Sequence, residues 1–229
     1  MGIPGSDCPA GHRYGKRKLR MGGLFFTSIL GVVLVVSGAS VLLIEMDNRD
    51  QRICLIAYVL QYIGVVLLFV RIFSIQIILS FFLPGLMGAA ILGTDQVNLR
   101  DRITFGPIFT SARIFRFLMA VIISILIFSI EPKFAVWIPI PDSILFCSLF
   151  LIVMGLFTFG LSPLLLNRFL GILNLFLGFQ IVYMLLEESI LVLGFLTAIN
   201  LLISLLGAYL VSTQSTEPLP EESEEGDSE

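Results

Sequence analysis

The stretch NRFLGILNLFLGFQIVYMLLEESILVLGFLTAINLLISLLGAYL, residues 167–210, decides the fold class of this chain. It is apolar almost throughout, and lipid is the solvent that favours apolar runs of this length. Backbone groups cannot reach water inside a bilayer, so helices satisfy their hydrogen bonds most economically. Residues 164–211 are about twice as long as one membrane crossing requires. They must therefore form two helices with a turn, and Glu187-Glu188-Ser189 is the only strongly polar place for it.

The composition of the whole chain points to the same class of protein. Of its 229 residues, 57% are hydrophobic and 14% are charged, whereas ordinary soluble domains have about 45–50% apolar and about 25% charged residues. The short alternating segments of a transmembrane β-barrel are not visible. We therefore predict an all-α integral membrane protein that crosses the membrane several times, and we expect it in the plasma membrane.

The apolar segments predict a bundle of seven transmembrane helices, with six as the alternative. Residues 53–93 are too long for one helix, so a turn is expected near Arg71. The first apolar segment has small residues that resemble a signal-peptide cleavage site, but it continues past them, and we expect a retained helix. The predicted helices lie near residues 22–44, 53–70, 72–93, 115–130, 143–161, 164–186 and 189–211.

The two ends of the chain have opposite charge. Residues 1–20 form a basic tail that we expect to be disordered, residues 21–211 the transmembrane domain, and residues 212–229 an acidic, disordered tail. The acidic tail carries seven carboxylates, which leaves ten acidic residues against fourteen basic ones in the remainder. Each side of a seven-helix bundle receives seven Lys and Arg residues. The positive-inside rule therefore does not decide the orientation.

The paired glutamates Glu187 and Glu188 allow two interpretations. They are residues of a hairpin turn at the membrane surface, which we favour, or they form a proton-titrating site that faces a cavity. A hairpin would place Asn174 and Asn200 at equal depth, about 20 Å from the tip. We expect these amides to bond to each other or to a neighbouring helix, and cysteines at both positions should crosslink if they pair.

Further residues are predicted to hold helices together or to contact lipid. Gly85, Ala89 and Gly93 fall on one helix face, and the pairs Gly171 with Gly178 and Gly194 with Ala198 have similar spacings. Gln61 and Gln180 are candidates for polar contacts between helices. The candidate lipid or anion contacts are the arginines of the polar stretch 94–116, namely Arg100, Arg102, Arg113 and Arg116.

Motifs for catalysis and cofactor binding are not found in the sequence. There is no nucleotide-binding loop, no zinc-protease motif and no hydrolase nucleophile motif, and the only histidine is His12. The three cysteines are far apart, so no metal site is predicted. The basic run near the N-terminus directly precedes a membrane span, which does not suggest nucleic-acid binding. Whether the chain is an enzyme is left open, although catalytic activity of its own is not favoured, and no cofactor is expected.

Two stretches resemble a known group of proteins. They are RICLIAYVLQYIGVVLLFVRIFSIQIILSFFLPGLMGAAILG (52–93) and the stretch 167–210 quoted above. Together they resemble bacterial polytopic membrane proteins of complex I-like and Mrp-type antiporter systems. The second stretch is also similar to the small three-helix NuoK/MrpC/HyfE-type subunits.

This resemblance implies a small subunit of an ion-translocating complex, with larger antiporter-like membrane subunits as partners in the lipid bilayer. Such subunits carry glutamates within their helices, whereas the comparable acids here, Glu187 and Glu188, lie at the predicted hairpin tip. No proton-path role is therefore carried over to a residue. The alternative function is a stand-alone small transporter or a membrane assembly factor.

Overall fold

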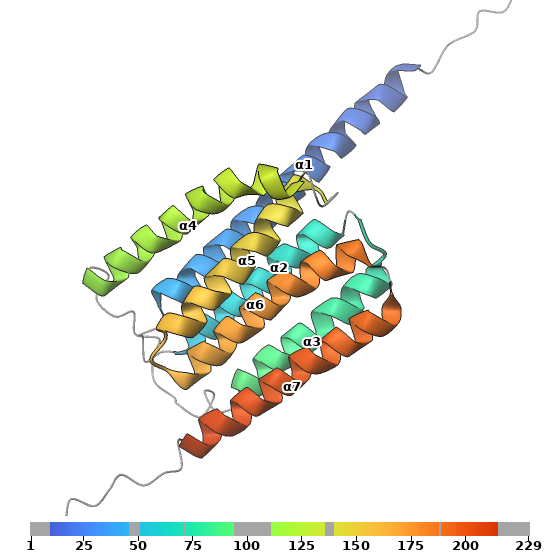
Figure 1. Cartoon of the computed structure of the whole chain (residues 1–229). Coiled ribbons are helices and arrows are strands. Elements are labelled where there is room, and N and C mark those ends of the chain that lie inside the picture. Colours follow the sequence, from blue (N-terminus) through green and yellow to red (C-terminus); the bar gives the residue numbers. More distant parts are fainter. Residues whose placement is uncertain are drawn as a thin grey trace, which may run out of the picture.

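The computed structural model of the chain describes residues 10–45, 51–70, 72–93, 111–135, 140–187 and 189–214. All regular structure within these ranges is helical (Figure 1). The helices are α1 (Ala10–Ile44), α2 (Gln51–Phe69), α3 (Ile75–Gly93), α4 (Ser111–Ala135), α5 (Asp142–Leu161), α6 (Leu165–Leu186) and α7 (Ile190–Gln214). Each of the seven contains a segment long and apolar enough to cross a membrane. The predicted all-α membrane fold is confirmed, and the alternative of six helices is wrong.

The first helix begins earlier than the sequence suggested. It starts at Ala10, so residues 10–20 of the expected disordered tail are helical. This segment contains no proline, and extending an existing helix costs much less than nucleating one. With 35 residues, α1 is about 52 Å long. Its apolar span is Thr27–Ile44, and its N-terminal part projects beyond the other helices (Figure 1).

The other helix ends differ from the predicted ones by a few residues. Helix α3 begins at Ile75 because the carbonyl of Ser74 accepts hydrogen bonds from the N–H groups of Ile77 and Ile78, at 3.1 and 3.2 Å. Helix α4 is longer at both ends than the predicted 115–130. Helix α7 continues to Gln214, so the first residues of the expected acidic tail are helical; residues 215–229 lie outside the described residues.

The helices form two three-helix units with the same order of packing. Helix α2 packs against α1 and α3 in the first unit, and α6 packs against α5 and α7 in the second. The units are stacked, with α1 against α5, α2 against α6 and α3 against α7 (Figure 1). Helix α4 connects the units and lies at one edge, against α5 and α1. Corresponding helices of the two units therefore cross the membrane in the same direction.

Glycines bring the helix backbones together within each unit. A Cβ atom added to Gly31 of α1 would lie 2.9 Å from the carbonyl oxygen of Gly64 in α2, and the reverse distance is also 2.9 Å. A Cβ on Gly155 of α5 would lie 2.7 Å from the carbonyl oxygen of Gly171 in α6. One on Gly178 would lie 2.6 Å from the carbonyl oxygen of Ser148. Side chains cannot be accommodated at these crossings.

The glycines singled out in the sequence have different surroundings. A Cβ on Gly85 would overlap the ring of Tyr62, whereas one on Gly93 would make an ordinary contact of 3.6 Å with Leu55. Ala89 is buried on the same face. Nothing lies within 4 Å of the Cβ position of Gly194. The spacing of small residues therefore identified a close helix contact at Gly85 and at Gly171 and Gly178, but not at Gly194.

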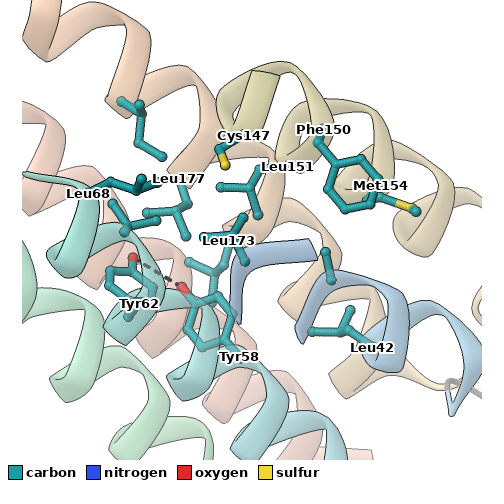
Figure 2. Close-up of a cluster of buried hydrophobic side chains, with 14 of the residues drawn as sticks. Leu42, Tyr58, Tyr62, Leu68, Cys147, Phe150, Leu151, Met154, Leu173 and Leu177 are labelled. Carbon is teal, nitrogen blue, oxygen red and sulfur yellow. Dashed lines mark hydrogen bonds between the residues drawn. The ribbon is translucent and has the colours of Figure 1, made fainter. Parts of the chain in front are cut away.

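A cluster of buried side chains extends over α1 to α6, and Figure 2 shows part of it. Two tyrosines of α2 belong to it, together with aliphatic, aromatic and sulfur-containing side chains of α1, α2, α5 and α6. The labelled members are Leu42, Tyr58, Tyr62, Leu68, Cys147, Phe150, Leu151, Met154, Leu173 and Leu177. Dense packing here supplies dispersion energy, which is the main attraction between helices in lipid.

A glycine-to-alanine substitution tests whether helices touch closely at the glycines. We expect Gly171→Ala to lower the free energy of unfolding by about 1–3 kcal/mol, because its Cβ would lie 2.6 Å from the backbone nitrogen of Phe159. Gly194→Ala is the matched control, since its Cβ position is open, and it should not lower stability. Unfolding in mixed micelles measures both. Equal stability of the two variants would contradict the α5–α6 packing.

Candidate functional site

A chain of hydrogen-bonding side chains crosses the bundle interior between α2 and α7. The Tyr58 hydroxyl donates to the Tyr62 hydroxyl at 3.3 Å (Figure 2). The Asn200 side-chain N–H donates to the same Tyr62 oxygen, also at 3.3 Å. The Ser204 hydroxyl donates to the Asn200 backbone carbonyl at 2.9 Å. These four residues, called the polar centre below, are at most 2% exposed, and they connect one three-helix unit to the other.

Two glycines of α3 make room for the polar centre. A Cβ on Gly85 would overlap the Tyr62 ring, and a Cβ on Gly88 would overlap the Ser204 hydroxyl. The ring of Phe81, also in α3, lies 5.9 Å from that of Tyr62. Helix α3 therefore covers the polar centre and excludes lipid from it. The sequence pattern suggested that Gly85 packs closely, but it did not identify Tyr62 as the neighbour.

The hydrogen bonds of the polar centre leave part of its capacity unused. The Tyr62 oxygen accepts from both Tyr58 and Asn200, while the side-chain oxygen of Asn200 has no partner. Rotating the amide by half a turn would exchange its two ends. In either orientation one polar end of Asn200 has no hydrogen-bond partner on the protein.

Two other predicted amides are fully buried and lack hydrogen-bond partners on the protein. The side-chain nitrogen and oxygen of Gln61 have no hydrogen-bond partner, and neither do those of Asn174. Of the two expected arrangements, the bond between Asn174 and Asn200 is not formed, whereas Asn200 bonds to another helix through Tyr62 of α2. Gln61 lies against Gly38 of α1, where an added Cβ would be 2.6 Å from its Cγ. Gln180 is also buried, at 2% exposure.

The buried polar side chains of the described residues are all neutral. They are Gln61, Ser148, Thr158, Ser162, Asn167, Asn174, Gln180, Asn200 and Ser204. Amides and hydroxyls donate and accept hydrogen bonds without changing charge at neutral pH. The interior is therefore suited to binding water or uncharged polar groups. In the described part of the chain, no group of three or more His, Cys, Asp or Glu residues is arranged to hold a metal ion.

The structure places Glu187 in the turn between α6 and α7. Its backbone is extended, with φ −135° and ψ 116°, and its N–H donates to the Tyr183 carbonyl at 3.0 Å. The Tyr183 hydroxyl donates to Glu187 Oε2 at 3.4 Å. Glu187 is exposed, as the hairpin interpretation requires. Glu188 lies outside the described residues.

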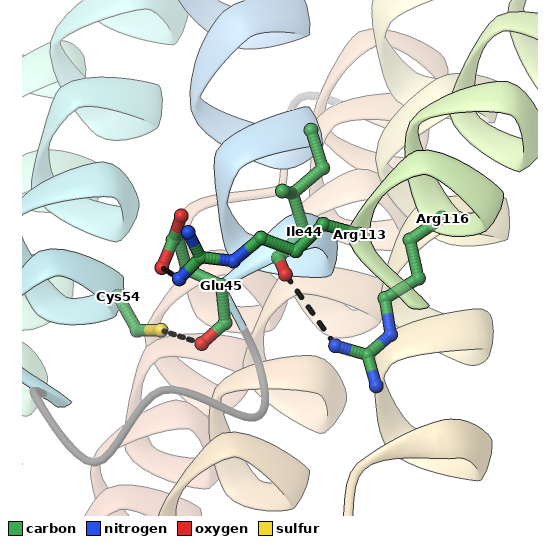
Figure 3. Close-up of polar contacts among 5 residues, drawn as sticks. All are labelled: Ile44, Glu45, Cys54, Arg113 and Arg116. Atoms are coloured by element: carbon green, nitrogen blue, oxygen red, sulfur yellow. Dashed lines mark hydrogen bonds and ion pairs between the residues drawn. The ribbon is translucent and has the colours of Figure 1, made fainter. Parts of the chain in front are cut away.

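An ion pair connects α1 to α4 at the other membrane face (Figure 3). Arg113 donates to Glu45 Oε2 at 2.8 Å, and the two side chains are 16% and 14% exposed. Arg116 donates to the Ile44 carbonyl at 3.5 Å, and the Cys54 thiol donates to the Glu45 carbonyl at 3.7 Å. The end of α1 is thus bound to the beginnings of α2 and α4.

The sequence predicted anion contacts for four arginines but not this partner. Arg113 contacts an anion of the protein itself, and Arg116 contacts a backbone carbonyl, while Arg100 and Arg102 lie outside the described residues. Glu45 was not predicted as a site residue, although it is the first acid after an apolar segment. Tyr58 and Ser204 were also missed, because tyrosine and serine are common in membrane helices without any special role.

Buried polar side chains with and without a hydrogen-bond partner should respond differently to substitution. We expect Asn174→Leu to raise the free energy of unfolding by about 1 kcal/mol, because it removes buried polar atoms that lack a protein partner. Tyr62→Phe should lower it by about 0.6 kcal/mol, since it removes the oxygen that Tyr58 and Asn200 share. Unfolding in mixed micelles measures both variants. Destabilisation by Asn174→Leu would mean that this amide has a partner.

The ion pair can be measured with a double-mutant cycle. We expect Glu45→Gln and Arg113→Gln to show a coupling energy of about 0.5–1 kcal/mol, typical of a partly exposed pair. The coupling should decrease as salt concentration rises. Additive effects of the two substitutions would show that the pair does not stabilise the contact between α1 and α4.

Comparison with known proteins does not assign the chain to a family. No protein-family model matches it, and no match is found among the curated proteins or among the solved structures. The sequence and the geometry thus describe an integral membrane protein whose described residues form seven apolar helices, a neutral polar centre and charged contacts at the helix ends.

Proposed function

We propose that the chain is a small, non-catalytic subunit of an ion-translocating membrane complex of the complex I-like or Mrp type. The observation that carries the proposal is the three-helix unit formed by α5, α6 and α7. The stretch that resembles small three-helix subunits, residues 167–210, covers most of α6 and α7 in this unit. The other resembling stretch, residues 52–93, covers α2 and α3 of the first unit.

The neutral interior favours a supporting role over a proton path within this chain. Polar side chains in the bundle interior are amides and hydroxyls, and proton relays in membranes ordinarily use ionisable side chains. Glu187 lies at an exposed hairpin tip rather than inside a helix. In this proposal the larger antiporter-like subunits carry the ions, and this chain contributes packing surface.

Helices α4 and α7 offer the surfaces on which such subunits would pack. Only 17% of the apolar span in α4 and 22% of that in α7 is buried within the chain. Large side chains project from α4, among them Phe117 and Phe128, which are 58% and 71% exposed. Lipid or another subunit must cover them, and a subunit interface would use the same dispersion forces that hold the bundle together.

A second candidate, a stand-alone transporter of small uncharged solutes, is favoured by the position of the polar centre. Tyr62 and Asn200 lie near the middle of α2 and α7, at the junction of the two three-helix units. In transporters built from internal repeats, substrates bind near the membrane midplane at the repeat interface. The unpaired oxygen of Asn200 would hydrogen-bond such a solute.

Purification from the native host in mild detergent distinguishes the two candidates. For the subunit proposal we expect antiporter-like or quinone-oxidoreductase subunits to copurify in stoichiometric amounts, as identified by mass spectrometry. A tagged polytopic protein of unrelated function, purified from the same membranes, is the control for non-specific capture. Recovery of the chain alone, at its own mass by native mass spectrometry, would overturn the subunit proposal and leave the transporter.

A further inference from the structure

A pocket lies where the turn after α2 meets the hairpin between α6 and α7. Its volume is about 390 Å³, within the range of roughly 300–1,000 Å³ that is typical of small-molecule sites. Its lining residues come from the connection between α2 and α3 and from the hairpin between α6 and α7, so the pocket belongs to both three-helix units. The lining residues are Ile72, Phe73, Ser74, Ile77, Tyr183, Met184, Glu187, Ser189, Leu193 and Leu196.

The walls of this pocket, called the hairpin pocket below, are mostly apolar. Met184 and Leu196 are buried at 5% and 7% exposure, and Ile77 and Leu193 are partly buried. These side chains come from α3, α6 and α7, which fixes the shape of the wall. An aliphatic chain or a ring of a ligand would exclude water from them, and that burial would be the main source of affinity.

Among the described residues that line the hairpin pocket, Glu187 is the only charged one. Tyr183 donates its single hydroxyl proton to Glu187 Oε2, at 3.4 Å. Glu187 Oε1 and the remaining lone pairs of Oε2 can therefore accept hydrogen bonds from a ligand. The Ser74 and Ser189 hydroxyls also line the pocket and can act as acceptors. An anionic ligand would be repelled by Glu187 at this position.

From these contacts we propose that the hairpin pocket binds an amphipathic molecule with a protonated amine head group. The ammonium group donates to the Glu187 carboxylate, and the apolar part lies against Ile77, Leu193 and Leu196. The binding requires neither a partner subunit nor solute transport, so it is independent of the proposed function. The same head-group chemistry exists in a free alkylamine and in an aminophospholipid.

The charge preference is tested with three probes that share one tail. We use n-octylammonium, n-octanol and n-octanoate on the full chain in phosphatidylcholine nanodiscs, with saturation-transfer NMR and thermal unfolding as readouts. We expect octylammonium to bind best, octanol more weakly and octanoate least. Glu187→Gln should weaken octylammonium binding by about threefold to tenfold and leave octanol binding unchanged. Glu187 is exposed, so this variant is expected to fold normally.

A second variant and a second lipid complete the test. Leu193→Trp fills the apolar wall and should abolish binding of octylammonium and octanol alike. Stabilisation by phosphatidylethanolamine nanodiscs that is lost in Glu187→Gln would identify a lipid as the occupant, whereas stabilisation by octylammonium alone would identify a soluble amine. Octanoate binding as tight as octylammonium binding, or an unchanged preference in Glu187→Gln, would overturn the proposal.

Discussion

Direct backbone contact between helices at glycine is the constraint on which this bundle depends. Lipid tails are as apolar as leucine side chains, so helices in a membrane are not driven together by the hydrophobic effect and rely on close packing. Gly31 with Gly64 allows that packing in the first three-helix unit, and Gly155 with Gly171 allows it in the second. The two strongly packed pairs, α1 with α2 and α5 with α6, then stack on each other and enclose the tyrosine-containing core.

The hydrogen bonds between helices in the bundle interior depend on this close packing. Helix α2 packs against α1 and α6, and its Tyr62 contacts both α3 and α7. Gly85 and Gly88 let α3 lie directly over Tyr62 and Ser204, and Asn200 of α7 bonds to Tyr62. A bond of this kind contributes only about 0.6 kcal/mol in a membrane. Its effect is to set the register of α7 against α2 more than to hold the helices together.

Among the described residues, charged side chains lie toward the ends of the helices, and the buried polar side chains are neutral. Glu45 and Arg113 tie α1 to α4 at one face, and Glu187 lies in the α6–α7 turn at the other. Between them the buried polar groups are amides and hydroxyls. This separation places neutral hydrogen-bonding groups at mid-depth and charged groups at the helix ends. The proposed subunit role and the proposed hairpin pocket concern different parts of this arrangement.

The sequence by itself determined the fold class, a bundle of six or seven helices and the turn at Glu187, because span length and hydrophobicity are local properties that lipid imposes on any chain. It also indicated which glycines could permit close contact. Only the tertiary structure decided the partners. Asn200 binds Tyr62 rather than Asn174, Gly194 contacts nothing while Gly171 contacts α5, and Glu45 pairs with Arg113. These choices depend on how each helix is rotated about its axis, and in a helix that is apolar on all sides the sequence pattern does not specify that rotation.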